Sequence, residues 1–425
     1  MIDELPAAIL RGPDLSDFRI SKRYRFERRF RLLGLSAIGL ALVILVILLF
    51  SIVYKGQSAF WQTYIAIDVN LESVSTAQLN KVNFRALSRN AIGSSFPNVK
   101  SRQDKKQLYK LFSNGIEYEV QNFILKNKSL IGSSLRIWVK ASADIDMLRK
   151  DFIDRNVKQS NRRISNKQLE YYDALDREKR IEKRFNVTFF TSADSREPEQ
   201  AGILGALVGS ILTLMVTLLL AFPIGVGAAI YLEEFAKKSR WSDIIEVNIN
   251  NLAAVPSIVF GLLGLAVLLN WFGMPRSAPI AGGVVLALMT LPTIIISSRS
   301  AIKAVPPSIR EAAFGMGASP FQTVIHHVLP LAMPGMLTGA IIGMAQALGE
   351  TAPLLMMGMV AFIVDVPGSL TDAATVLPVQ IFLWADAPER AFVERTSAAI
   401  MVLLAFLITM NLLAIILRKK FERRW

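Results

Sequence analysis

The chain has 425 residues, a 52% hydrophobic fraction, a mean hydropathy of +0.40 and a formal net charge of +14. This apolar fraction excludes an ordinary soluble protein of this size, and the absence of cysteine excludes disulfides, thiolate metal sites and a cysteine nucleophile. The positive charge gathers at the ends of apolar segments and in one polar block, which is typical of membrane topology and argues against a nucleic-acid partner.

The first apolar segment, Leu32–Tyr54, has the roughly 20 residues that a helix needs to cross a bilayer. Because the polar residues 1–31 precede it, we expect a retained anchor at 32–55 and not a cleaved signal peptide. Lysines and arginines cluster between Lys22 and Arg31, and the positive-inside rule assigns this basic segment to the cytoplasm.

Residues 56–200 form a polar block that we interpret as an inserted extracytoplasmic α+β domain. Apolar and polar residues alternate over Gln62–Ser73, which predicts a strand, and Ile116–Leu125 and Ser134–Ala141 are candidates for further strands. The charged segment Lys158–Phe185 has apolar residues at helical spacing and predicts a long amphipathic or coiled helix. The block is basic, but long loops translocate largely regardless of charge, and its charge is more simply a solvated face than an anion site.

The remaining chain, 201–425, contains five further apolar segments of spanning length. They are Ile203–Tyr231, Leu252–Phe272, Ile280–Ser297, Leu331–Gly349 and Ala398–Leu417. Six spans bring both termini to the cytoplasmic side, where the short loops carry the lysine and arginine clusters. The sequence therefore predicts an α-helical membrane protein with six transmembrane helices, the last five forming a core.

A short motif lies in the polar segment between the fourth and fifth spans, at about residues 298–330. It reads EAAFGMGASP from Glu311 and continues to a Leu-Pro pair at 329–330. Gly317 is expected to follow the end of one helix, and Ser319 with the proline after it to begin the next. Such a helix–turn–helix on the cytoplasmic face is a feature that another protein can hold.

This pattern resembles the coupling-loop signature of type I ABC-importer permeases. The resemblance implies a permease core whose loop inserts into a groove on an ATP-binding subunit and transmits the closure of that subunit to the pore. The chain has no G-x-x-x-x-G-K-[ST] phosphate loop, so ATP hydrolysis is expected in a separate polypeptide and this chain is not expected to be an enzyme. The matching residues are Glu311, Ala312, Ala313, Gly317, Leu329 and Pro330.

The fifth span carries glycines at four-residue spacing, which lets neighbouring helices approach closely in a membrane. A glutamine and a glutamate continue this face, and an ionisable residue near bilayer depth normally faces a partner or a wet path. We expect the face to line the translocation path or the contact with a partner permease. Its residues are Gly339, Gly343, Gln346, Glu350 and Thr351.

The run ALGETAPLL at 347–355 resembles the G-E-T-A-P segment of phosphate-importer permeases of the PstA/PstC type. With the coupling loop, the resemblance covers roughly 200–425, and the first span with its large insert is similar to a longer PstA-like subgroup. That family pattern has an arginine four residues before the glutamate, where this chain has Gln346. Either the partner permease supplies the cation that pairs with Glu350, or the cargo differs. Glu350 is expected to act in gating or in pairing and not to touch an anion directly.

The resemblance implies the permease subunit of a phosphate importer in a bacterial inner membrane, surrounded by lipid. The implied partners are a PstC-like permease, PstB-like ATP-binding subunits and a PstS-like extracytoplasmic phosphate-binding protein, with no cofactor, metal or nucleic acid. A permease for phosphonate, sulfate or molybdate is the alternative within this class. A membrane-anchored sensor is a less favoured alternative because little chain follows the last span, and no nucleophile–base pair favours an enzyme.

Overall fold

The computed structural model describes residues 17–72, 82–127, 129, 131–237 and 239–421. It divides into two compact units, residues 1–54 and 55–425. Several residues covered by the predictions lie outside the described ones: the first sixteen residues of the basic N-terminal segment, Ser73 at the end of the first predicted strand, and the last four residues of the predicted core, 422–425.

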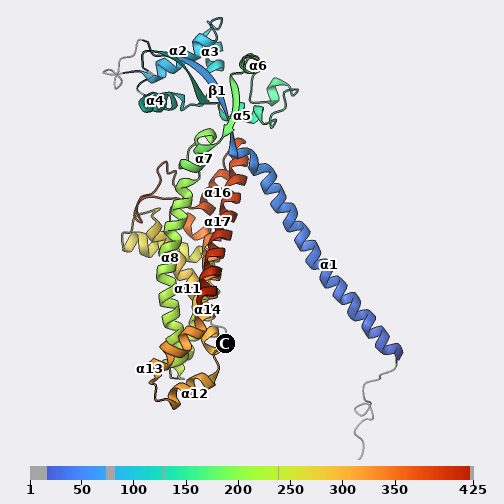
Figure 1. Ribbon diagram of the computed structural model, residues 1–425, viewed down its shortest axis with the longest axis vertical. Helices are drawn as coiled ribbons and strands as arrows, with labels where there is room; N and C mark the ends of the chain where they lie inside the picture. Colours follow the sequence, from blue (N-terminus) through green and yellow to red (C-terminus); the bar gives the residue numbers. More distant parts are fainter. Residues whose placement is uncertain (1–16, 73–81, 128, 130, 238, 422–425) are drawn as a thin grey trace, which may run out of the picture. The chain divides into compact units, whose positions relative to one another are not determined.

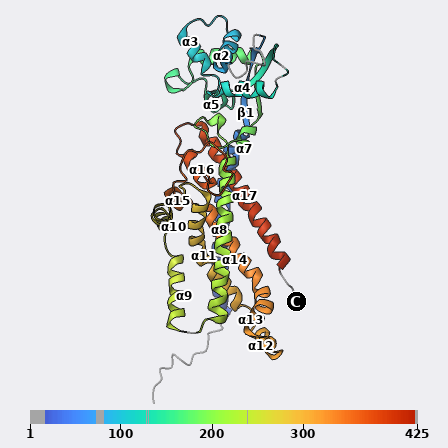
Figure 2. The ribbon, with the colours of Figure 1, turned by 90° about the vertical axis from the view of Figure 1, so that its left-hand side faces the viewer.

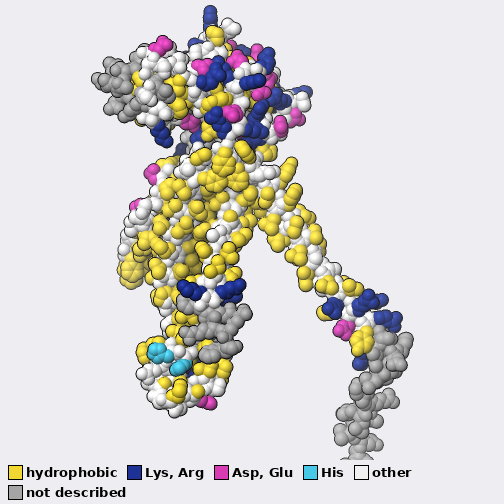
Figure 3. All heavy atoms as spheres, viewed as in Figure 1, with side chains coloured by type: hydrophobic (Ala, Val, Ile, Leu, Met, Phe, Trp, Pro, Cys, Tyr) yellow, Lys and Arg dark blue, Asp and Glu magenta, His cyan; other side chains and the backbone are white. Residues whose placement is uncertain are grey.

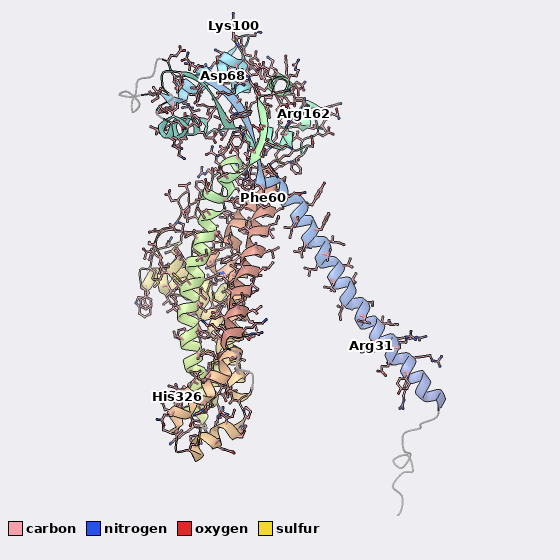
Figure 4. The ribbon with its side chains drawn as sticks, in the orientation of Figure 1. Arg31, Phe60, Asp68, Lys100, Arg162 and His326 are labelled. Atoms are coloured by element: carbon pink, nitrogen blue, oxygen red, sulfur yellow. The ribbon has the colours of Figure 1, made fainter. Side chains whose placement is uncertain are left out.

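The first unit is formed by helix α1, Asp17–Gly56, up to Tyr54. The helix contains the predicted span and extends beyond it towards the N-terminus. Arginine is a good helix former, so the helix continues through the basic cluster that includes Arg31 (Figure 4).

The second unit begins with an α+β domain over 57–200, built around a three-stranded antiparallel sheet of order β2-β1-β3. The strands are β1 (Trp61–Asn70), β2 (Ser134–Lys140) and β3 (Ile181–Phe185). On the central strand, Ile65 lies opposite both Val139 and Ile181, and all three side chains are buried in one core. The strands predicted from 62–73 and 134–141 are therefore confirmed over the residues described.

Short helices cover this sheet and connect its strands. They are α2 (Phe84–Ser95), α3 (Arg102–Tyr109), α4 (Ile116–Lys126), α5 (Ala143–Arg149), α6 (Asn166–Arg177) and α7 (Val187–Thr191), with single 3₁₀ turns at Gln57–Phe60 (η1), Gln159–Asn161 (η4) and Pro198–Gln200 (η5). Figure 1 shows this domain at one end of the second unit.

The strand expected at Ile116–Leu125 is wrong, because this segment is helix α4. Its buried residues, Val120 and Ile124, are four apart, which is a helical period and not the period of two of a strand. Glu117 and Glu119 lie in its first turn, where negative charge stabilises the helix dipole.

The single long helix expected over Lys158–Phe185 is also wrong, since the segment contains the 12-residue helix α6 followed by strand β3. A capping box between Ser165 and Gln168 begins α6. The helix ends before Lys179, whose φ of 55° is left-handed, and the chain then turns so that Ile181 joins the sheet.

A helical bundle forms the rest of the second unit, with α12 and α13 at the end far from the 57–200 domain (Figures 1 and 2). Its long helices are α8 (Leu204–Ile230), α9 (Arg240–Ala253), α11 (Pro279–Lys303), α14 (Leu329–Gly349) and α17 (Ala391–Phe421). The shorter ones are α10 (Ser257–Leu263), α12 (Pro307–Gly315), α13 (Pro320–Thr323), α15 (Ala352–Met356) and α16 (Leu377–Ala385), with π-helical turns η6 (Tyr231–Phe235), η7 (Gly264–Trp271) and η8 (Val324–Val328).

Hydrophobic side chains cover these helices, whereas charged side chains gather on the 57–200 domain (Figure 3). Within the described residues, five helices of the whole chain are long and apolar enough to cross a membrane, and a sixth is counted if one bent pair is taken as a single span. The fourth and sixth predicted spans coincide with the candidate spans α11 and α17, which are longer than expected. The fifth is continuous from Pro320, because η8 joins α13 to α14 without a break.

The third predicted span, Leu252–Phe272, is not one helix. The chain bends by 102° between α9 and the helical segment Ser257–Trp271. Pro256 lies at the break, and a proline both lacks an amide hydrogen and disfavours helical backbone at the residue before it, here Val255. The apolar residues on both sides hid this break from a hydropathy argument.

A buried ionic junction joins the 57–200 domain to the first turn of α17. The Lys150 ammonium lies 2.6 Å from Asp146 of α5 and 2.8 Å from Glu394 of α17, and these three side chains are only 4% exposed. The other Glu394 oxygen accepts a hydrogen bond from the Ser58 hydroxyl at 2.7 Å. The junction therefore ties together α5, α17 and the turn η1 that precedes β1.

A second buried charge, Arg395, lies beside this junction. Its guanidinium donates to Gln62 of β1 at 2.7 Å and stands over the ring of Phe189 at 5.7 Å. Nearby, burial raises the pKa of the Glu199 carboxyl. Buried charges are tolerated only where partners surround them, so this part of the molecule depends on a specific arrangement of both domain and bundle.

Replacing Lys150 with methionine leaves two carboxylates buried side by side. Removing one partner of a buried charge cluster costs about 3–5 kcal/mol, so we expect Lys150→Met to lower the unfolding temperature of the purified protein markedly. The additional change Glu394→Gln should recover part of the loss, because it removes one of the stranded charges.

The matched control is Arg85→Met, which breaks a solvent-accessible ion pair between an exposed arginine and the partly exposed Glu117 at 3.7 Å. Exposed pairs contribute about 0–1 kcal/mol, so this variant should unfold close to the wild-type temperature. Equal unfolding temperatures for Lys150→Met and Arg85→Met would show that the junction contributes no more than a surface pair.

Candidate functional site

The turn between α12 and α13 has the local structure that its sequence predicts. Gly317 has a left-handed φ of 83°, which a residue with a Cβ adopts only at a cost. The next residue closes the helix end with a 3.0 Å bond from its amide to the Ala313 carbonyl. Ser319 and Gln322 then form a reciprocal capping box, with Pro320 as the first residue of the new helix. The predicted helix–turn–helix is confirmed.

The six signature residues differ in exposure. Ala313 is 1% exposed and lies where α12 contacts η8, so it packs the turn against the bundle. Leu329 and Pro330 are half-buried at the start of α14. Three residues remain accessible to another molecule: Glu311, Ala312 and Gly317.

Exposed apolar side chains surround these three residues, and the sequence analysis did not single them out. We call Phe314, Met316 and Phe321 the loop patch; their exposed fractions are 49%, 77% and 63%. Large apolar side chains grouped on a surface mark interaction sites in soluble regions of proteins. The turn thus presents a carboxylate, Glu311, beside an apolar surface, and within the described residues no hydrogen bond or ion pair engages that carboxylate.

Arg310 attaches this turn to the ends of two long helices. Its guanidinium binds the Glu234 carboxylate at 2.6 Å and donates to the backbone carbonyls of Val305 and Ile302 at 2.8 and 3.1 Å. Glu234 belongs to η6 at the end of α8, and the two carbonyls belong to the end of α11 and the turn after it. Arg310 therefore links α12 to the ends of α8 and α11.

A second arginine extends the same network to α9. Arg299 binds Glu233 and also Glu246 of α9, the latter at 2.8 Å, and Lys303 lies 3.4 Å from Glu233. Sequence reasoning missed these ion pairs. Two glutamates follow the apolar segment of α8, and arginines lie at and after the end of the apolar segment of α11, which indicates that ion pairs can form there. The spacing alone does not tell which carboxylate binds which arginine.

The glycine face of α14 packs against α11 of the same chain. A Cβ added to Gly339 would overlap the side chain of Ser297, whereas one added to Gly343 would meet Ile294 and Thr290 at 3.5 and 3.6 Å, which is ordinary contact. The sequence indicated close helix packing here but not which helix is the neighbour. These two glycines have α11 as an intrachain neighbour. Their expected place on the translocation path or at the contact with a partner permease stays a prediction.

The polar residues beyond the glycines are arranged differently. Gln346 is exposed, and Glu350 is half-buried just past the end of α14, with extended backbone. Within the described residues, no hydrogen bond or ion pair engages either side chain. Thr351 follows at the break, where its carbonyl accepts the first bond of α15 from Leu355 at 3.0 Å. Glu350 and Thr351 therefore lie together between two helices.

Two adjacent histidines, His326 and His327, lie on η8, near the α12–α13 turn. His326 is exposed and His327 half-buried (Figure 4). Within the described residues, no group of three or more His, Asp or Glu side chains is arranged to hold a metal ion.

Two family matches divide the chain. Residues 17–159 match a domain of unknown function, DUF3333, and residues 221–425 match the binding-protein-dependent transport system inner membrane component. The second match contains both the α12–α13 turn and the end of α14.

Individual relatives include named permeases. The chain is 31% identical over 229 residues to the phosphate transport system permease protein PstA 1 of Mycobacterium tuberculosis, an alignment that covers 53% of this chain and 74% of the relative. It is 30% identical over 220 residues to the phosphate transport system permease protein PstA of Yersinia pestis, covering 52% and 73%. It is 34% identical over 172 residues to the probable ABC transporter permease protein YqgI of Bacillus subtilis, covering 40% and 58%.

Among solved structures, a chain of the MetNI methionine ABC transporter in an inward-facing conformation is similar with a TM-score of 0.41 and 19% identity. That likeness covers 51% of this chain and 95% of the other.

The two glycines of α14 give a test of its packing. Because Gly339 has no room for a methyl group, Gly339→Ala should lower the free energy of unfolding by about 1–3 kcal/mol, the usual cost of overpacking. Gly343→Ala adds the same methyl group one turn further on, in ordinary contact, and should unfold near the wild-type temperature. Thermal unfolding of the two purified variants measures the difference, and an equal effect of both changes would contradict the contact with Ser297.

Proposed function

This chain belongs to the PstA-type permeases of type I ABC importers, and from that premise we propose that it forms, with a second permease, the membrane path of an ATP-driven importer of inorganic phosphate. It is a non-catalytic subunit, since its relatives are permeases and ATP hydrolysis resides in a separate subunit. The proposed partners are a PstC-like permease, PstB-like ATP-binding subunits and a PstS-like phosphate-binding protein. The relatives from Mycobacterium tuberculosis and Yersinia pestis are phosphate transport system permeases, which supports phosphate as the cargo.

The proposed orientation has both termini and the α12–α13 turn in the cytoplasm of a bacterium, with six spans through the inner membrane if α9 and α10 cross together. The 57–200 domain then lies outside. Support comes from the arrangement of the second unit, in which this domain and the turn lie at opposite ends of the apolar bundle (Figures 1 and 2). In domain terms, 1–31 is the basic segment, 32–55 the first span, 56–200 the insert and 201–425 the core.

The proposed coupling mechanism is mechanical. The ATP-binding subunit contacts Glu311, Ala312 and the loop patch, and its closure moves α12. The single observation that carries this proposal is the attachment of α12 through Arg310. Its guanidinium binds the Glu234 carboxylate at the end of α8, and also one carbonyl at the end of α11 and one in the turn after it. A bidentate, charge-assisted contact of this kind is directional, so a movement of the turn reaches two membrane helices without a flexible link.

We further infer that Glu350 and Gln346 face the translocation path or the second permease. A carboxylate near the end of a membrane helix is costly unless a partner or water accompanies it, and within the described residues this carboxylate has no partner. A cation from the second permease, or a wet path, supplies what the chain itself lacks. A carboxylate repels an anion, so the role of Glu350 is pairing or gating and not direct contact with phosphate.

The backbone at Gly317 gives a test of coupling at one position. Gly317→Val forces a branched side chain into left-handed backbone and should disturb the turn, whereas Gly317→Asn adds a side chain of similar size that tolerates this conformation. We expect the valine variant to lose most phosphate uptake and to retain less ATP-binding subunit on purification. The asparagine variant should keep both. Equal loss in both variants would attribute the effect to a contact of the bare glycine and not to its backbone.

The charge on Glu350 is tested with a double-mutant cycle. Glu350→Gln keeps the size of the side chain and should reduce phosphate uptake several-fold while the complex still assembles. Gln346→Arg should be tolerated when Glu350 is present, because the two positions are one helical turn apart. Combined with Glu350→Gln, the arginine is isolated and costs about 2.5–3.5 kcal/mol at membrane depth, so recovery of the complex should fall. Unchanged uptake by Glu350→Gln would exclude a role for its charge.

A further inference from the structure

An aromatic cluster is exposed at the base of the 57–200 domain, where the domain meets the helical bundle. Trp61, Phe185 and Val187 are 51%, 52% and 57% exposed, and Phe190 is 38% exposed. With the half-buried Phe60, labelled in Figure 4, we call these five residues the base cluster. Large apolar side chains grouped in this way are unfavourable in water and normally have a partner.

The cluster is one continuous, ordered surface. The rings of Phe185 and Phe190 stack with their centroids 5.7 Å apart, and Phe60 stacks on Phe190 at the same distance. Trp61 lies opposite Phe185 in the sheet and meets its ring edge-on at 6.3 Å. The ring centroid of Phe190 lies 5.1 Å from that of the fully buried Phe189, so the exposed rings pack on a buried one.

Backbone hydrogen bonds hold the cluster level with the ends of two apolar helices. The amide of Asn186 donates to the carbonyl of Phe60, the last residue of the apolar helical stretch that contains α1, at 2.8 Å. The amide of Ile203, immediately before α8, donates to the carbonyl of Phe189 at 2.8 Å. Because both helices are candidate spans that end here, the cluster is held at the height of a membrane boundary.

We propose that the base cluster is an interfacial anchor, whose partner is the boundary between headgroups and acyl chains of the leaflet that faces the 57–200 domain. Tryptophan is stable at this depth, since its ring is apolar and its indole N–H is polar. Phenylalanine side chains occur on the apolar face of segments that lie in the interface. Lys183 is exposed and lies two residues before Phe185, hence on the same face of β3, where its ammonium suits lipid phosphates. Only the identity of the leaflet rests on the orientation proposed above.

This anchor gives the domain a fixed height above the membrane. Together with the buried Lys150 junction to α17, it makes the domain a surface of defined depth and tilt for whatever approaches it. A second permease lying over the cluster, or exposure of the cluster to water, are the alternatives that an experiment has to separate.

Since the chain has no cysteine, single cysteines report depth cleanly. Val187→Cys, carrying an environment-sensitive fluorophore, is incorporated with the whole transporter complex into bilayers that contain nitroxide lipids. Lys100→Cys, exposed at the far end of the domain (Figure 4), is the matched control. We expect lipid nitroxides near the headgroup to quench the label at 187 at least several-fold more than the label at 100, and aqueous iodide to do the opposite.

Two results would overturn the proposal. Quenching of both labels by iodide alone means that the cluster faces water, and protection of position 187 from both quenchers means that another protein chain covers it. Orientation is measured separately, because a membrane-impermeant thiol reagent added to spheroplasts should label Lys100→Cys but not Met316→Cys, which is on the loop patch. Reversed labelling with lipid quenching at 187 would reject the orientation and keep the anchor.

Discussion

Close packing of small residues along α11 is the constraint on which the bundle depends. A Cβ on Gly283 of α11 would approach Val216 of α8 within 2.6 Å, and one on Gly225 of α8 would approach Ile294 of α11 within 2.7 Å. On another side of α11, Ser297 fills the space left by Gly339. Lipid offers no hydrophobic drive for helix association, so such van der Waals contact sets which helices are neighbours. It also brings the ends of α8 and α11 close together, so that Arg310 of α12 can bind Glu234 after α8 and the Ile302 carbonyl of α11 at the same time.

The two candidate regions, the α12–α13 turn and the end of α14, combine this close packing with side chains that other molecules can contact. At one end of the bundle, the loop patch and Glu311 are accessible while Arg310 behind them is fully engaged. At the end of α14, Glu350 has no partner within the described residues, although the helix that carries it is tightly packed. This combination supports the proposal that the chain works within a larger assembly, in which neighbouring subunits contact these groups.

Local backbone structure could be predicted from the sequence, whereas the choice of neighbouring helices and strands could not. Gly317 and Ser319 have backbone preferences that depend on their immediate neighbours, so the turn was correctly predicted, as was the strand whose alternation includes Ile65. The neighbour of Gly339, by contrast, depends on which helix lies opposite, and helical periodicity carries no such information. Pro256 was visible in the sequence, but the apolar residues on both sides of it favoured one continuous span. Over Lys158–Phe185, the spacing of the apolar residues suited a helix throughout. The last five residues instead form strand β3, because they pair with β1.

The junction at the first turn of α17 has a consequence for engineering this chain. A domain inserted between two spans is usually regarded as an accessory that can be removed or exchanged. Here its removal would take away the lysine that neutralises Glu394 and the glutamine that binds Arg395, leaving two adjacent, formerly dry charges to be hydrated at the head of the final helix. A successful transplant of this domain into another permease must therefore carry the first turn of α17 with it.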